Sequence, residues 1–77
     1  MYQTTIDPVK NTVYQNMVLR TTDNTWIILN PLNKEAVKFG YWLKAGNLPT
    51  PAANTTLDMG WVANTITLLT TNTPVPL

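Results

Sequence analysis

No disulfide can stabilise this chain, because its 77 residues include no cysteine. Histidine is absent as well, and structural zinc sites are built mainly from cysteine and histidine. A domain of this size buries only about 60 % of its unfolded surface, so its margin of stability is small. Small scaffolds that lack disulfides and metals commonly depend on oligomerisation. The sequence therefore predicts one domain whose core is completed by neighbouring subunits.

The polar surface of the chain is made of uncharged residues. Charged residues make up 12 % of the sequence, about half the proportion of ordinary soluble domains. Threonine and asparagine contribute 14 and 9 residues instead. Five basic and four acidic residues leave a net charge of +1, and weakly charged surfaces tend to associate. The composition favours a chain that packs against other proteins.

The residue types also favour β structure, because β-branched and aromatic side chains suit a pleated backbone. A hairpin is predicted over Thr12–Arg20 and Thr25–Leu29. Asp23 and Asn24 lie between the two segments, and both residue types tolerate a left-handed backbone. These two residues are therefore the predicted centre of the turn.

Residues 36–44 are compatible with either a helix or a strand. A helix could be capped by Asn30, and its apolar residues would recur at spacings of three and four. A strand would place alternate residues from Val37 to Leu43 on one face. Gly40 in a helix interior would cost about 1 kcal/mol. The alternation favours the strand.

Two further strands are predicted after a proline-containing loop over residues 45–55. Apolar residues alternate over 57–61 and then, on the opposite parity, over 62–68. The change of parity beside Gly60 suggests a β-bulge, which inserts one residue and reverses the facing. These segments belong to a predicted β core over residues 12–69.

The predicted fold class is mainly β, a small antiparallel sandwich or barrel-like sheet. Extended arms are expected at both ends, over residues 1–11 and 70–77. In the second arm each proline lacks a backbone donor and cannot pair fully in a sheet. The arms are expected to lie across adjacent subunits.

Catalysis is poorly supported by the side chains present. Acid–base chemistry near neutral pH most often uses histidine, and common nucleophiles are serine and cysteine, none of which occurs. The four carboxylates are Asp7, Asp23, Glu35 and Asp58, of which Asp7 precedes a proline and Asp23 lies in the predicted turn. We therefore expect no enzymatic activity, no metal and no cofactor.

The most distinctive local pattern lies in Lys38–Lys44. As a strand, this segment would place Trp42 between two lysines on one face, beside Gly40. Bases can stack on such an aromatic side chain while lysines contact phosphate. The segment resembles the aromatic, glycine-spaced strand of cold-shock and related RNA-binding domains, which implies binding of single-stranded nucleic acid. Phosphate contacts dominate that affinity, so the nearly neutral chain is not expected to have nucleic acid as its main partner.

Trp26, Trp42 and Trp61 could instead form a glycan-binding platform among amide and hydroxyl side chains. Alternatively, Trp26 and Trp61 lie in the core or in a buried interface, since large aromatic side chains supply much contact area. A small binding module for glycan or single-stranded nucleic acid is thus the alternative function.

In size, threonine and asparagine content, lack of cysteine and extended termini, the chain resembles small bacteriophage virion proteins, especially capsid decoration or cement subunits. The resemblance implies a non-enzymatic, homo-oligomeric virion component that stabilises a larger assembly of protein subunits. Neither a secretion signal nor an apolar run of about 20 residues is visible, so synthesis in the host cytoplasm is expected. The candidate interaction residues are Lys38, Tyr41, Trp42, Lys44, Pro49, Pro51, Pro74 and Pro76.

Overall fold

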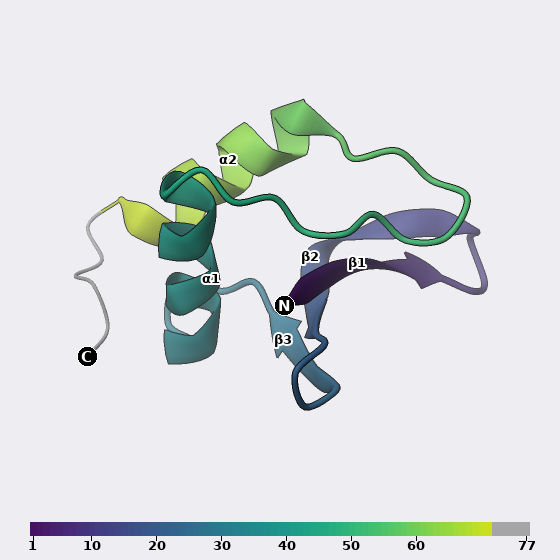
Figure 1. The fold of residues 1–77 in the computed structure, drawn as a ribbon, viewed down its shortest axis with the longest axis horizontal. Coiled ribbons are helices and arrows are strands. Elements are labelled where there is room, and N and C mark those ends of the chain that lie inside the picture. Colours follow the sequence, from purple (N-terminus) through teal and green to yellow (C-terminus); the bar gives the residue numbers. More distant parts are fainter. Residues whose placement is uncertain (72–77) are drawn as a thin grey trace.

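A three-stranded antiparallel sheet is followed along the chain by two helices (Figure 1). The computed structural model describes residues 1–71. The strands run in the order β1-β2-β3 across the sheet. The elements are β1 (Tyr2–Asp7), β2 (Thr12–Arg20), β3 (Thr25–Ile28), α1 (Lys34–Lys44) and α2 (Met59–Thr70).

The predicted hairpin is confirmed by β2 and β3. The two strands pair antiparallel, with Leu19 opposite Trp26 and Arg20 opposite Thr25. Asn24 in the connecting turn has a φ of 56°, the left-handed conformation that asparagine tolerates. Local turn chemistry therefore determined this part of the fold.

Most of the expected N-terminal arm forms a strand of the same sheet. β1 pairs antiparallel with β2, and Tyr2 is buried in the core. Thr4 pairs with Val18, but Ile6 pairs with Val13, so β2 has extra residues between these two pairs. These extra residues form a bulge in β2. The bulge leaves the carbonyl of Gln15 free to accept a hydrogen bond from the indole Nε1 of Trp61 at 2.8 Å. One side chain of α2 thereby holds the bulge of β2.

The strand prediction for residues 36–44 is wrong, because this segment lies in α1. The side chain of Asn33 caps the helix by accepting from the backbone N–H of Glu35 at 3.1 Å. The residue that argued against a helix, Gly40, is buried where α1 meets α2. A Cβ on Gly40 would lie 2.4 Å from the Cβ of Leu69. The glycine is needed because the two helices approach so closely.

The two strands predicted within residues 57–68 are also wrong, because α2 occupies Met59–Thr70. Asp58 caps this helix, and its Oδ1 accepts from the N–H groups of Gly60 at 2.9 Å and Trp61 at 3.2 Å. Trp61, Thr65 and Leu69 are buried at intervals of four residues, which forms one helical face. Packing of this face outweighs the modest helix propensity of its threonines.

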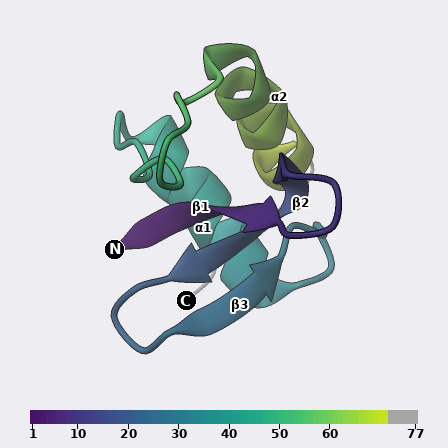
Figure 2. The same cartoon turned by 90° about the vertical axis from the view of Figure 1, so that its right-hand side faces the viewer.

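Both helices lie on the same side of the sheet, so the fold is a mixed α and β domain rather than a β sandwich or barrel (Figure 2). The core fills the space between the two layers. Its largest fully buried side chains are Phe39, Ile27, Leu69 and Val18. The expectation of an antiparallel sheet holds, but the expectation of a mainly β domain does not.

The predicted proline-containing loop connects α1 to α2 and runs beside β1 (Figure 1). Thr50 accepts a hydrogen bond from the N–H of Thr4 at 3.0 Å and donates its own N–H to the carbonyl of Tyr2 at 2.9 Å. The N–H of Ala52 donates to Oγ1 of Thr4 at 2.7 Å. The loop therefore covers the outer edge of β1.

Candidate functional site

The side of the sheet that faces away from the helices carries a group of apolar side chains. Leu19 is paired with Trp26, and Met17 with Ile28, so the strand register places all four on one face. The intervening pair, Val18 and Ile27, is buried on the opposite face beneath the helices. We call the first group the outer face; it consists of Met17, Leu19, Trp26 and Ile28.

Two side chains of the outer face are open to solvent, whereas Met17 and Leu19 are half-buried. Trp26 is 56 % exposed and Ile28 is 55 % exposed. In Figure 2, α1 lies behind the sheet, and no described segment lies in front of β2 and β3. Exposed apolar side chains that lie together, unlike singly scattered ones, are candidates for a binding surface.

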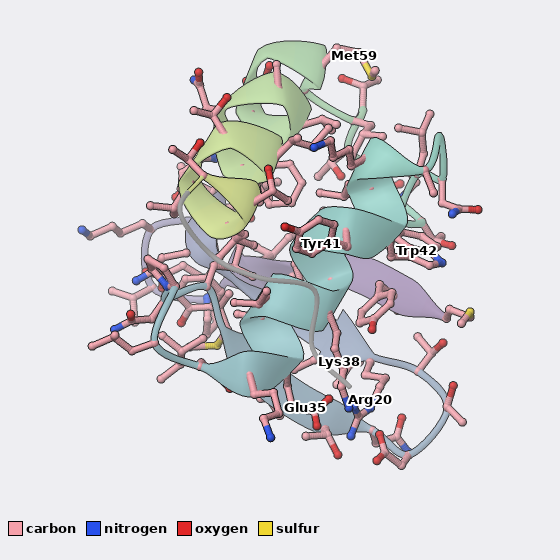
Figure 3. All side chains as sticks on the ribbon, turned by 90° about the vertical axis from the view of Figure 1, so that its left-hand side faces the viewer. Arg20, Glu35, Lys38, Tyr41, Trp42 and Met59 are labelled. Carbon is pink, nitrogen blue, oxygen red and sulfur yellow. The ribbon has the colours of Figure 1, made fainter. Side chains whose placement is uncertain are left out.

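The charged side chain of Arg20, next to the outer face, points to the other side of the sheet. Arg20 ends β2 on the helix side of the sheet, where it forms two hydrogen bonds with Asp23, at 2.9 and 3.0 Å. Its third hydrogen bond, 2.6 Å long, reaches Glu35 in the first turn of α1. Figure 3 shows Arg20, Glu35 and Lys38 close together at one end of that helix. The outer face is consequently free of charged side chains.

These ion pairs predict how stability depends on pH. Hydrogen bonding from Arg20 lowers the pKa of the Asp23 carboxyl from 3.8 to about 2, and it also lowers the pKa of Glu35 below its usual 4.5. Because both pKa values are depressed in the folded state, the stabilisation is complete above pH 4.5 and is lost as the pH falls toward 2. Urea unfolding of the wild type should therefore show a falling midpoint across this range.

The matched variant is Arg20→Met, which keeps an unbranched apolar stem but donates no hydrogen bond. Its unfolding midpoint should fall less steeply over the same acid range, because the hydrogen bonds from Arg20, the largest cause of both depressed pKa values, are then removed. An equally steep fall in both proteins would show that these ion pairs do not cause the acid dependence.

The four candidate interaction residues in α1 do not form the predicted face. Successive helical residues are rotated by about 100°, so Lys38 lies one turn before Trp42 on the same side of α1, whereas Lys44 lies on the opposite side. Trp42 is half-buried instead, with ring centroids 4.9 Å from Tyr2 and 5.9 Å from Phe39.

The charged and phenolic candidates of α1 make local contacts. Lys38 lies 3.5 Å from Glu35, and the ammonium of Lys44 lies 5.7 Å from the ring centroid of Tyr41. Figure 3 shows Tyr41 and Trp42 on different sides of the helix. The flat aromatic strand that resembled RNA-binding domains is therefore not present at this segment.

The four proline candidates fall in different places. Pro49 is buried and Pro51 is exposed, both in the loop that covers β1. Pro74 and Pro76 lie outside the described residues, as does most of the expected C-terminal arm. Within the described residues, the prolines of this group lie in the segment beside β1, whereas the outer face belongs to β2 and β3.

A concave region lies between β2 and the start of α2. It has a volume of about 360 Å³. Its lining contains a carboxylate, two amides and the edge of a largely buried indole. These groups belong to Asp58, Gln15, Asn64 and Trp61.

All four carboxylates of the chain have structural contacts. Asp7 accepts hydrogen bonds from the backbone of the turn after β1, and Asp58 caps α2. Asp23 and Glu35 are bound by Arg20. Among residues 1–71, no cluster of three or more carboxylate, histidine or cysteine side chains could hold a metal ion. No helix within this range is both long enough and apolar enough to cross a membrane.

Sequence reasoning identified Trp26 as a core or interface residue but missed Met17, Leu19 and Ile28. The available signal was the uninterrupted apolar run Trp26–Leu29, since a strand that is apolar on both faces is usually covered on both. Trp61 was correctly expected to be buried. Trp26 does not belong to the core of the single chain.

Comparison with known proteins finds no match of this chain to a family model, a curated protein or a solved structure.

Proposed function

We propose that this chain is a non-enzymatic structural subunit that attaches to other protein subunits through its outer face. The observation that carries the proposal is the exposure of Trp26 and Ile28 on the uncharged, apolar outer face. Burial of apolar surface stabilises association by roughly 25 cal/mol per Å² before the entropic cost of binding is subtracted. Large aromatic side chains at the centre of a patch contribute most to such interfaces.

The assembly that we propose is a virion, in which the chain acts as a capsid decoration or cement protein. The support for this step is compositional: a small chain, rich in threonine and asparagine and without cysteine. Repeated attachment around a symmetric shell would multiply individually modest contacts into tight binding. The uncharged outer face suits attachment to a protein surface better than attachment to nucleic acid, which needs cationic contacts.

The experiment follows the full chain in extracts of the cells that produce it, by sedimentation through a density gradient. We expect the wild type to sediment with particles much larger than its own 8.6 kDa. The double variant Trp26→Thr/Ile28→Thr should stay near the top of the gradient, because threonine preserves strand propensity but removes the apolar contact.

A matched control substitutes two similarly exposed apolar residues of α2. Met59 is 56 % exposed and Leu68 is 48 % exposed, so Met59→Thr/Leu68→Thr changes a similar apolar surface at another place. This control should sediment like the wild type. A wild-type chain that sediments as a free monomer, or an outer-face variant that stays on the particle, would contradict the proposed function.

The concave region between β2 and α2 supports a second candidate function, binding of a neutral glycan. Amide groups of Gln15 and Asn64 can bond sugar hydroxyls, whereas the carboxylate of Asp58 disfavours phosphate. Titration with neutral oligosaccharides should then shift the side-chain amide NMR signals of these two residues. Unchanged amide signals at saturating oligosaccharide would remove this candidate.

A further inference from the structure

The hydrogen bond made by Leu29, the residue after β3, shows which backbone groups of β3 point away from β2. The N–H of Leu29 donates to the carbonyl of Asn16 at 2.8 Å, which makes these two residues a hydrogen-bonded pair. In an antiparallel ladder the bonded residues alternate, so Ile27 and Thr25 also bond to β2. The backbone groups of Trp26 and Ile28 therefore point away from the sheet.

One of these two residues offers both a donor and an acceptor. The carbonyl of Ile28 already accepts from the N–H of Asn30 at 2.9 Å and from Nδ2 of Asn33 at 3.1 Å. Trp26 has its N–H and its carbonyl both directed outward. A residue with this arrangement is complementary to itself, because two copies related by a two-fold axis can exchange both hydrogen bonds.

At Trp26 the edge of β3 carries none of the features that keep sheet edges apart, although at Ile28 the segment after the strand already occupies the carbonyl. Such edges are usually blocked by lysine, proline, a bulge or a covering segment. β1 is covered by the loop through Thr50, but β3 contains only threonine, tryptophan and isoleucine. The chain protects one edge of its sheet and leaves the other available.

The outer face would be extended by pairing at this edge. With the axis at Trp26, each indole lies beside the indole of the second copy, and aromatic cross-strand pairs of this kind are favourable. Leu19, the partner of Trp26 within the sheet, continues the apolar row on each side. The outer face holds no charge and the whole chain has a net charge of +1, so two copies do not repel each other strongly.

From these observations we propose that β3 pairs with β3 of a second copy of this chain, antiparallel and with the two-fold axis at Trp26. The result is one continuous sheet with an apolar face that spans both copies. The inference rests on the proposed assembly role and names its first partner, which is the chain itself.

The test uses the purified full chain over a wide concentration range. Sedimentation velocity should show the mass rising from that of a monomer to twice that value. Amide hydrogen exchange, read by NMR on the same samples, should slow at least about tenfold at Trp26 and Ile28 as the dimer fills. The N–H of Thr50 bonds to Tyr2 within one chain, so its exchange should not depend on dimer formation.

Two variants separate edge pairing from packing of side chains. Ile28→Thr and Ile28→Pro both remove the isoleucine side chain, but only proline removes the outward N–H that would face Asn24 of the second copy. Proline is tolerated at an edge position whose N–H points to solvent. The dissociation constant of the dimer should be about tenfold higher for Ile28→Pro than for Ile28→Thr, since two backbone bonds are lost per dimer.

Each other outcome overturns the proposed pairing. A dimer in which the Trp26 amide still exchanges freely, or equal dissociation constants for the two variants, would indicate packing of outer faces without edge pairing. A purified chain that stays monomeric, yet sediments with large particles in cell extracts, would indicate a different protein as the partner. In that last case the proposed function would stand and the pairing of two copies would not.

Discussion

Replacement of Phe39 by alanine is expected to lower the free energy of unfolding by about 3–5 kcal/mol. Phe39 is fully buried, and its ring centroid lies 4.8 Å from that of Tyr2 and 6.4 Å from that of Trp61. The ring thus joins β1, α1 and α2 at the centre of the core. The loss should appear in urea unfolding followed by far-UV circular dichroism.

The control for this prediction is Leu32→Ala. Leu32 is 93 % exposed in the loop before α1, so its truncation removes little buried surface and should change stability by less than about 0.5 kcal/mol. Phe39→Leu, which keeps much of the volume, should lie between the two. If Phe39→Ala unfolded at the wild-type urea concentration, the described core would be incorrect.

Gly40→Ala is expected to destabilise the protein by about 1–3 kcal/mol, although alanine is the better helix former. The new Cβ would lie 2.4 Å from the Cβ of Leu69, which is fixed to the backbone of α2 and cannot rotate away. The two helices must therefore move apart and lose contacts around the close approach. Thermal unfolding should show a clear fall in the midpoint.

Gly60→Ala provides the same substitution in the first turn of α2. There the nearest atom to the new Cβ is Oδ1 of Asp58 at 3.2 Å, a side-chain atom that needs to shift by only a few tenths of an ångström and can keep its capping hydrogen bonds. We expect a change within about 0.5 kcal/mol of the wild type. Equal destabilisation by both substitutions would mean that the contact between α1 and α2 is not what requires Gly40.

Sequence reasoning succeeded where local chemistry decides the structure. The hairpin of β2 and β3 was found because Asp23 and Asn24 prefer a turn and the flanking residues prefer strands. The covering loop was found because its prolines and Gly46, which has a φ of 103°, interrupt regular structure.

The helices were missed because contacts between distant residues decide them. Gly40 lowers helix propensity, and its compensation comes from Leu69, far away in the sequence. The caps formed by Asn33 and Asp58 were present in the sequence as N-cap residue types. Giving those caps more weight than the alternation of apolar residues would have favoured both helices.

The candidate site was missed for a related reason. A strand over Lys38–Lys44 would expose Trp42, so the sequence suggested Trp42 as an interaction residue. In the structure its ring packs against Tyr2 and Phe39. The position of α1 determines which face of β3 is covered by the helices. The pattern of apolar residues in the strand does not specify that position. The exposure of Trp26 could therefore be recognised only in the folded chain.

The central claim is that the outer face is a contact surface, and hydroxyl-radical footprinting tests it most directly. Trp26 and Met59 are each 56 % exposed and both react readily, so Met59 serves as the internal control. In the dilute purified chain both side chains should be oxidised. In the assembled particle we predict that oxidation of Trp26 falls severalfold while that of Met59 does not change, whereas equally rapid oxidation of Trp26 in the particle and in the dilute chain would contradict the claim.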